Sequence, residues 1–266
     1  MVLPPPEYHK QQKRRNIMDH ISHSQITTWL MCQKRWEYNK VLEIKTIPTE
    51  NLIIGSVYHQ LLQANFIHKI NTGEDFTDEE YQEEFAHLWK FKLEEEEDIK
   101  WVKMDANKAR AVCLSIVSEY MYRVAEFVEP KEVEFEFERP IGDTKIIGRI
   151  DLIDKSGAVI DHKTSTRSYT QNDIDKDIQA SAYAFGLGHP ITYYNHIAIK
   201  KNKPEIQSLK TYRNEEDIIW WYRLASDVIA EMNTGIAVPN PTGWWCSPDY
   251  CDYWDICRAD LAKKIF

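Results

Sequence analysis

Two acidic residues and a lysine stand at a spacing that suits hydrolysis of a phosphate ester. Asp161 and Lys163 are two residues apart within the stretch 159–164, so in a strand both side chains leave the same face. Asp151 lies ten residues earlier, and a turn would fold it back towards them. Converging carboxylates bind a hard cation such as Mg²⁺ or Mn²⁺, and a lysine can neutralise charge developing on phosphate oxygens. An isolated Asp-x-Lys triplet is common, however, and is more typical of a surface hairpin with a salt bridge.

The elements that would position these residues follow from the spacing of apolar side chains. From Glu132 the apolar period changes from 3.6 to 2, which predicts a half-buried strand. Strands at about 145–153 and 158–163 would form a hairpin through a turn at 154–157. Helices are expected at about 55–66, 78–97, 105–127, 173–187 and 215–232, with another after a Ser24 N-cap and a strand near 193–200. The expected fold class is α/β or α+β, with a mixed central sheet flanked by helices.

Chain length sets the expected domain organisation. The chain has 266 residues, and we expect residues 1–20 to form a flexible arm and residues 21–266 a single domain. Within that domain we expect a helical region at about 60–128, a catalytic core at about 130–203, and a C-terminal helix with clustered cysteines at about 205–266. The basic run in the arm is either a solvated tail or a nucleic-acid contact.

Charge and hydropathy exclude some classes of protein. The net charge of −9 excludes broad, nonspecific coating of nucleic acid by charge alone, although a narrow basic groove is compatible with it. The apolar runs fall short of the roughly 20 residues needed to cross a bilayer. The first ten residues also lack the apolar stretch of a secretory signal. We therefore expect an intracellular, cytoplasmic protein without a membrane partner.

The cysteines are grouped in a way that favours a metal or a cluster over disulfides. There are five in a chain without an export signal, and Cys246, Cys251 and Cys257 crowd the C-terminal end. Thiolates at this spacing can bind zinc, can bind a four-iron, four-sulfur cluster if a fourth thiolate joins them, or can stay unliganded. Cys113 falls on the apolar stripe of an expected helix, which indicates a core thiol.

The hairpin carries a longer pattern than its charged residues. It reads Gly-Arg-Ile-Asp at 148–151, then a turn, then Val-Ile-Asp-His-Lys-Thr at 159–164. Three further motifs accompany it in order: Ser24 leading to Cys32 and the stretch 33–38, Gly55 followed by His59, and Gln179 followed by Tyr183. Together these five segments, spanning about 22–257, resemble the RecB-like branch of the PD-(D/E)XK nuclease superfamily. The most similar branch is the CRISPR-associated exonuclease-like family that carries an iron–sulfur cluster.

The resemblance implies a restriction-endonuclease-like core, with a helical N-terminal insertion and a cysteine-bearing tail. It implies that His59, Asp151 and Asp161 are metal ligands, with the carbonyl of His162 as a possible fourth, and that Lys163 is the catalytic lysine. Without the resemblance, His59 would be read as a structural histidine. Gln179 and Tyr183 are an i, i+4 pair that would contact DNA or support Lys163.

Basic residues near the core elements are candidates for contacts with backbone phosphates, although solvated side chains are the default reading. They are Arg149, Arg167, Lys200, Lys201 and Lys203. In the cysteine site, the resemblance implies Cys32 as the fourth ligand beside Cys246, Cys251 and Cys257. The chain has four residues between Cys246 and Cys251 where the family usually has two, which keeps zinc open as the metal.

The resemblance implies a Mg²⁺- or Mn²⁺-dependent DNA exonuclease that acts on DNA ends or single strands. The protein would be intracellular and of a prokaryotic or phage-like type. An endonuclease with the same site is one alternative. A non-catalytic DNA-binding or assembly subunit is another, although the intact Asp151, Asp161 and Lys163 argue against it. Aromatic residues are numerous enough to offer surfaces for base stacking.

Overall fold

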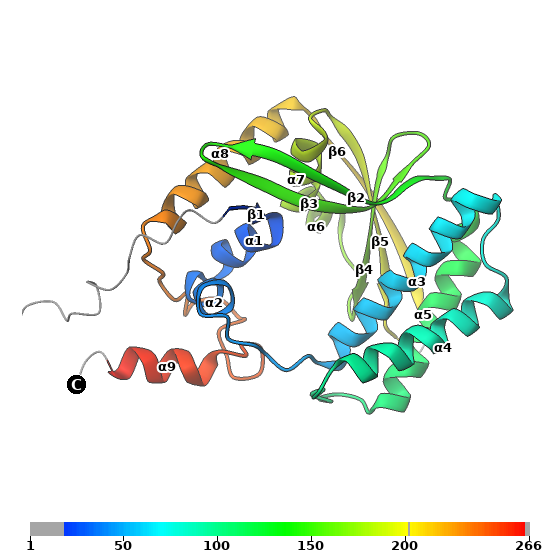
Figure 1. Cartoon of the computed structure of the whole chain (residues 1–266), viewed down its shortest axis with the longest axis horizontal. Helices are drawn as coiled ribbons and strands as arrows, with labels where there is room; N and C mark the ends of the chain where they lie inside the picture. Colours follow the sequence, from blue (N-terminus) through cyan, green and yellow to red (C-terminus); the bar gives the residue numbers. More distant parts are fainter. Residues whose placement is uncertain (1–18, 202, 264–266) are drawn as a thin grey trace, which may run out of the picture. The chain divides into compact units, whose positions relative to one another are not determined.

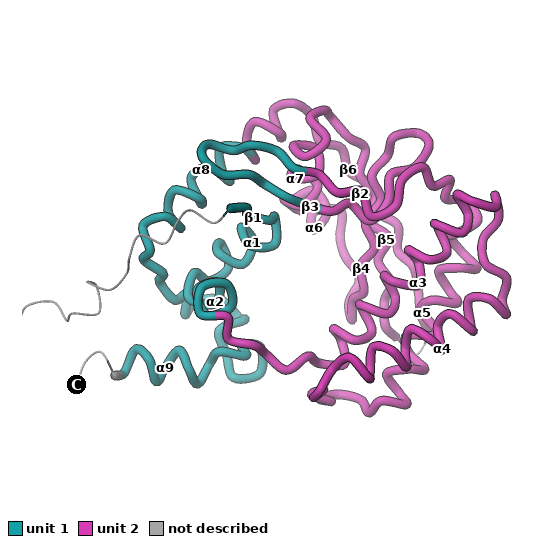
Figure 2. The backbone as a smooth tube through the Cα atoms, in the orientation of Figure 1, with its two compact units in different colours: residues 1–42, 138–148, 222–266 teal, residues 43–137, 149–221 magenta. Residues whose placement is uncertain are grey.

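The computed structural model describes residues 19–201 and 203–263 (Figure 1), so most of the expected N-terminal arm lies outside the described residues. The chain divides into two compact units (Figure 2), each described here by itself. Unit 1 comprises residues 1–42, 138–148 and 222–266, and unit 2 comprises residues 43–137 and 149–221. The single domain expected over 21–266 stays a prediction, because two compact units of one chain can still fold together.

A mixed sheet forms the centre of unit 2 and confirms the expected fold class. Its strands are β2 (Pro130–Ile141), β3 (Thr144–Asp154), β4 (Val159–Ser165), β5 (Ile191–Ile199) and β6 (Glu205–Arg213), of which β2 and β3 continue into unit 1. β3 pairs antiparallel with β4, β4 parallel with β5, and β5 antiparallel with β6, while β2 also pairs with β3. The expected strands are therefore present, and β6 is an addition that the sequence did not predict.

The hairpin of β3 and β4 forms where the turn residues predicted it. Leu152 lies opposite Ile160, and the backbone N–H of Asp154 donates to the carbonyl of Ala158 at 2.9 Å. Gly157 in the turn has a φ of +83°, in the left-handed region that glycine tolerates. The Asp154 carboxylate accepts from the backbone N–H of Ala158, which closes the turn.

Three helices cover one face of the sheet and build the core of unit 2 (Figure 1). They are α3 (Glu50–Thr72), α4 (Asp78–Glu95) and α5 (Ala106–Arg123), followed by the 3₁₀ turn η3 (Ala125–Phe127). Their buried residues pack with Leu152, Ile160 and Ala198 of the sheet. α3 is longer than the expected 55–66, and it ends at Gly73, whose φ is +89°.

The other face of the sheet carries α6 (Gln171–Asp175) and α7 (Ile178–Leu187), where a single helix at 173–187 was expected. The chain breaks because the Asp177 side chain accepts from the backbone N–H of Gln179 and starts a new helix there. The buried Arg213 guanidinium donates to the carbonyls of Ile174, Asp175 and Asp177 and so fixes the corner between the two helices.

Strand β2 does not keep the simple alternation that the sequence predicted. Glu134 has a φ of +52°, a conformation that a non-glycine residue in a strand adopts only at an irregularity. Before Glu134 in the sequence, Val133 packs against the core of α3–α5. After it, Phe137 packs against Tyr183 of α7, on the opposite face of the sheet.

Unit 1 brings residues from both ends of the described chain together. Its elements are β1 (Ile21–Ser22), α1 (His23–Met31), α2 (Gln33–Trp36), the π-helix η2 (Glu37–Val41), residues 222–233 of α8 (Glu215–Asn233) and α9 (Trp254–Lys263). The N-cap of α1 is Ser22 and not the expected Ser24, since the Ser22 hydroxyl accepts from the backbone N–H of Gln25. The Trp29 indole donates to Glu231 at 3.0 Å, which joins α1 to α8.

The helices of both units were also compared with the length and apolarity that a membrane span requires. Across residues 19–201 and 203–263, no helix is long and apolar enough to cross a membrane.

Candidate active site

Asp161 is a buried carboxylate at the centre of a hydrogen-bond network on β4. It is 2% exposed, and its Oδ1 accepts from the Gln179 amide at 3.0 Å and from the Tyr183 hydroxyl at 3.1 Å. Its Oδ2 lies 2.7 Å from Lys163 Nζ and forms an ion pair with it. Burial raises the pKa of Asp161 to about 6, because the nearby Lys163 only partly offsets burial and Asp151 adds repulsion.

Lys163 leaves the same face of β4 as Asp161 and is held on two sides. Its ammonium donates to the Gln179 side-chain oxygen at 2.7 Å, while the Gln179 amide nitrogen donates to Asp161. Burial alone would lower the pKa of Lys163, but Asp161 and Asp177 outweigh burial and hold it above its ordinary value. Lys163 is therefore a fixed positive charge at neutral pH.

Asp151 forms a second group, with two histidines. Its Oδ2 accepts from the backbone N–H of His162 at 2.9 Å, and lies 3.4 Å from His59 Nδ1 and 3.7 Å from His162 Nδ1. Burial would raise the pKa of Asp151, but the hydrogen bonds of His162 and the nearby His59 lower it to about 2. This carboxylate is ionised across the physiological pH range.

His59 lies on α3, one residue after the buried Tyr58, and faces Asp151. Burial lowers the pKa of His59, with Asp151 acting in the opposite direction. A neutral imidazole is the form that can coordinate a metal ion. Across the residues that the structure describes, however, no three His, Cys, Asp or Glu side chains are arranged to hold one.

Two predicted DNA-contacting residues lie outside these networks. Arg149 pairs with Glu134 at 2.6 Å, and Arg167 pairs with Asp173 at 3.2 Å, both with largely exposed side chains. The structure thus brings together Asp161, Lys163, Gln179 and Tyr183 in one group, and Asp151, His59 and His162 in another. Arg149 and Arg167 are held instead by acidic partners of their own.

Sequence reasoning missed the residues that support these groups from a distance. Tyr120 of α5 hydrogen-bonds to His162, and His196 of β5 hydrogen-bonds to Tyr120. Asp177 caps α7 next to Gln179, and Arg213 of β6 fixes the corner before it. No motif marked any of these four residues; the Asp–x–Gln spacing of a helix cap was a signal for Asp177 alone.

The sequence comparison decides the family. A sequence model of the PD-(D/E)XK nuclease superfamily matches residues 20–258, nearly the whole chain. The chain belongs to this superfamily. Membership of the PD-(D/E)XK superfamily implies a nucleic-acid substrate, and its nucleases typically use divalent metals such as Mg²⁺.

Solved structures were compared as well. A candidate exonuclease from Eubacterium rectale is similar at 12% identity, over 92% of each chain, with a TM-score of 0.56, which supports the PD-(D/E)XK fold. The protein SSO0001 has 18% identity over 89% of this chain and 97% of its own, with a TM-score of 0.37. Rai1 of Scheffersomyces stipitis has 12% identity over 94% and 70%, with a TM-score of 0.23. The last two TM-scores are too low to support an argument. A search of curated proteins found no match.

The clustered cysteines of this PD-(D/E)XK protein belong to unit 1. Cys32 follows α1, Cys257 is on α9, and the described residues hold them as free thiols together with Cys246 and Cys251. Burial raises the pKa of Cys257, a hydrogen bond with Tyr38 lowers it, and repulsion from the other three thiols raises it further. No three of the described cysteines are arranged to hold a metal ion.

Cys113 is separate from that group, as the sequence predicted. It is fully buried in the core of unit 2, and its thiol lies 3.6 Å from the carbonyl oxygen of Ile54. Burial raises the pKa of Cys113 to about 12, so this thiol is not reactive in the folded protein.

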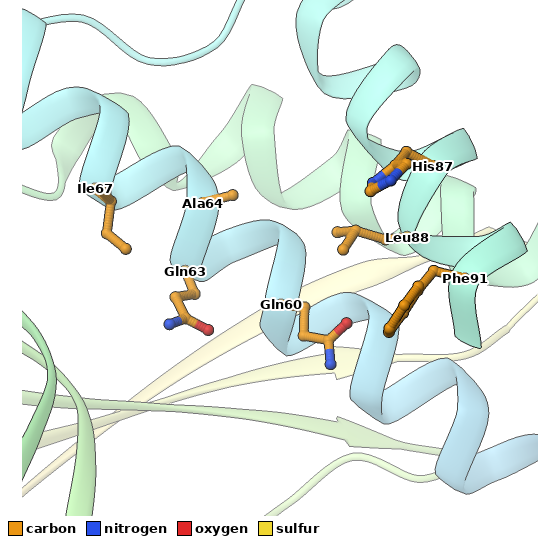
Figure 3. A pocket seen from close by; sticks show the side chains of 7 residues that line it. All are labelled: Gln60, Gln63, Ala64, Ile67, His87, Leu88 and Phe91. Atoms are coloured by element: carbon orange, nitrogen blue, oxygen red, sulfur yellow. The ribbon is translucent and has the colours of Figure 1, made fainter. Parts of the chain in front are cut away.

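A groove of about 480 Å³ lies between α3 and α4 of the nuclease, on the helix that carries His59 (Figure 3). Its described lining is Gln60, Gln63, Ala64, Ile67, His87, Leu88 and Phe91. Among these described residues there is no carboxylate, so the groove lacks the acidic ligands that the hairpin provides.

Proposed function

We propose that this protein is a Mg²⁺- or Mn²⁺-dependent DNA exonuclease that hydrolyses phosphodiester bonds at DNA ends or in single strands. The proposal rests on superfamily membership and on one observation above all. A charged lysine, Lys163, is held 2.7 Å from Oδ2 of Asp161, a carboxylate that is only 2% exposed. A pseudo-enzyme has no chemical need for a buried, costly arrangement of this kind.

By donor type, the carboxylates of Asp151 and Asp161 suit a hard divalent cation, although no three of the described His, Cys, Asp or Glu side chains are arranged to hold one. His59, Asp151, Asp161 and the main-chain carbonyl of His162 would hold the ion, which would offset negative charge on the scissile phosphate. Carboxylate and carbonyl oxygens are the donors that Mg²⁺ and Mn²⁺ prefer, and the neutral imidazole of His59 would add one nitrogen donor. The raised pKa of Asp161 supports this assignment, because a nearby cation would favour its ionised form.

Lys163, Gln179 and Tyr183 have separate roles in this proposal. The Lys163 ammonium would orient the attacking water or stabilise charge on a phosphate oxygen in the transition state. Gln179 holds Lys163 through its oxygen and Asp161 through its nitrogen, so its amide orientation is fixed. Tyr183 and Gln179 both donate to Asp161 Oδ1, which leaves Oδ2 facing Lys163.

DNA would be held through its backbone. Arg149 and Arg167 are exposed and each has one acidic partner, and ion pairs of this kind are weak enough to exchange for phosphate. The net charge of −9 favours a short path for a single strand or an end over wrapping of long duplex.

The four cysteines of unit 1 would bind a structural four-iron, four-sulfur cluster, with zinc as the less favoured metal. Supporting this, Cys32, Cys246, Cys251 and Cys257 lie near enough for their thiols to interact electrostatically. Hydrogen bonds such as that from Asn39 to Tyr253, at 3.2 Å, already join the N-terminal and C-terminal segments there. The cluster would lock this junction.

Cleavage of labelled oligonucleotides tests the proposal. Single-stranded DNA labelled at either end, incubated with Mn²⁺ or with EDTA, should lose nucleotides progressively from one end and only with Mn²⁺. A covalently closed circle of the same sequence should resist cleavage. Cutting of the circle would show that the protein is an endonuclease and not an exonuclease. Binding of DNA without cleavage of either substrate would favour the non-catalytic subunit.

A further inference from the structure

A buried chain of hydrogen bonds reaches the Asp151 side of the site from the opposite edge of His162. The Tyr120 hydroxyl lies 2.8 Å from His162 Nε2 and 3.1 Å from His196 Nδ1. His162 is 3% exposed and His196 is 6% exposed, so neither nitrogen facing Tyr120 is open to bulk water. On the other edge of the ring, His162 Nδ1 faces Asp151 Oδ2 at 3.7 Å.

The ring plane of His162 is fixed by packing. Phe66 stacks on it with centroids 5.8 Å apart and an interplanar angle of 21°. Tyr120 meets the same ring edge-on at 5.3 Å. The ring cannot turn without displacing buried aromatic side chains. Neighbouring groups can therefore still determine which of its two nitrogens carries the proton, but not how the ring is oriented.

Counting donors and acceptors decides where that proton lies. Asp151 Oδ2 already accepts from the backbone N–H of His162, so a lone pair on Nδ1 facing this oxygen would be repelled. We propose that Tyr120, by donating its hydroxyl proton to His162 Nε2, holds His162 as the Nδ1–H tautomer and thereby positions Asp151. The proposal rests on the proposed function in taking Asp151 as part of the catalytic site.

His196 completes the polarity of the chain. If Tyr120 donates to His162, its oxygen is free to accept, and His196 Nδ1–H is the donor within reach. His196 also lines a pocket of about 310 Å³ with Arg123 and Ser208. Every link then has one donor and one acceptor, which is the condition for a buried polar network to give order.

The tautomer itself is measurable in the wild-type protein without metal or DNA. Nitrogen-15 NMR of histidine-labelled protein, with the His162 signals identified by their loss in His162→Gln, should show a protonated Nδ1 and an unprotonated Nε2. Tyr120→Phe should move the proton of His162 towards Nε2. A wild-type His162 protonated on Nε2 would overturn the proposal, whether or not Tyr120→Phe folds.

Activity provides the second readout, with a closely matched control. Tyr58→Phe removes the same atom from the same aromatic cluster, but the Tyr58 hydroxyl has no hydrogen-bond partner in the described chain. Tyr120→Phe should raise the Mn²⁺ concentration for half-maximal cleavage by about 10- to 100-fold, with little change in the KM for DNA. Tyr58→Phe should leave both values unchanged.

Equal metal dependence in the two variants would overturn the positioning role of Tyr120. A wild-type protein that cleaves no DNA would instead contradict the proposed function, while the NMR result would still decide the tautomer. His196→Asn, which keeps a donor near the position of Nδ1, should retain wild-type metal dependence. A loss as large as that of Tyr120→Phe would contradict the assigned polarity.

Discussion

Lys163 and Asp161 are two residues apart on β4, and their charged groups meet at 2.7 Å beneath α7. Both charged groups have further partners, because Lys163 also donates to Gln179, and Asp161 Oδ1 accepts from Gln179 and Tyr183. A buried ion pair costs desolvation free energy that well-packed apolar residues would avoid. Its presence in a nuclease fold therefore indicates a site built for chemistry, with stability as a secondary matter.

His59→Ala should weaken metal binding and cleavage without unfolding the domain. The side chain is partly exposed and faces Asp151 at 3.4 Å, so its loss opens little of the core. Mn²⁺ affinity by calorimetry and thermal unfolding should be measured on the same preparation. A large drop in the unfolding temperature with normal activity per folded molecule would show that His59 is structural.

Cys32→Ala or Cys251→Ala should remove the brown colour of anaerobically purified protein and lower its solubility. About four irons and four sulfides per chain are expected in the wild type. Cys113→Ser is the matched control, because Cys113 is buried in the core of unit 2 whereas the other four cysteines belong to unit 1, and it should keep the colour. Stoichiometric zinc without iron would show that the four cysteines bind zinc and not an iron–sulfur cluster. Full colour in Cys32→Ala would reject Cys32 as a ligand.

Gly186→Ala should destabilise the protein, and Gly55→Ala should not. A Cβ on Gly186 would lie 2.5 Å from the ring of the buried Phe137, whereas one on Gly55 would lie 3.6 Å from Thr164 Oγ1, an ordinary contact. The first change should cost about 1–3 kcal/mol through overpacking. The second should gain up to about 1 kcal/mol in a helix. Denaturant unfolding of both variants measures the difference, and the same sign for both would contradict the packing described for β2 and α7.

His196 should make the metal-free protein less stable as the pH falls. Burial, together with the nearby His162, lowers the pKa of His196 to about 3 from its ordinary 6.5. Between these values the unfolded chain binds the extra proton, so the free energy of unfolding decreases with falling pH by up to about 1.4 kcal/mol per unit. His196→Asn cannot take up this proton and should flatten the dependence. An unchanged slope across this range would show that His196 is protonated in the folded state.

Local signals in the sequence were sufficient for the hairpin, since a turn and two apolar runs lie within 20 residues of one another. The features that the sequence did not predict depend on contacts between residues that are distant in the chain. The break between α6 and α7 depends on Arg213 of β6, more than 30 residues away, while the apolar pattern runs through it. The residues of strand β6 lack a regular alternation of apolar and polar types, and the strand is defined by its pairing with β5. Ser22 and Ser24 are equally good caps by residue type, and only backbone geometry separates them.

The candidate site shows the same division. The family resemblance implied that Gln179 and Tyr183 would contact DNA or support Lys163, and both form one hydrogen-bonded group with Asp161 and Lys163. Tyr120 gave no such signal, because it lies 42 residues from His162 and 76 from His196 on an otherwise ordinary apolar helix stripe. Such a contact exists only once α5 has packed on the sheet.

Separating metal binding from cleavage in Asp161→Ala and Lys163→Ala tests the central claim most directly. Single-turnover cleavage of end-labelled single-stranded DNA and Mn²⁺ affinity should be measured for both variants, with Lys155→Ala in the exposed hairpin turn as the control. The account predicts that both variants lose roughly 100-fold or more in rate, that Asp161→Ala alone loses metal affinity, and that Lys155→Ala matches the wild type. Near-wild-type cleavage by either Asp161→Ala or Lys163→Ala would contradict the assignment of this site.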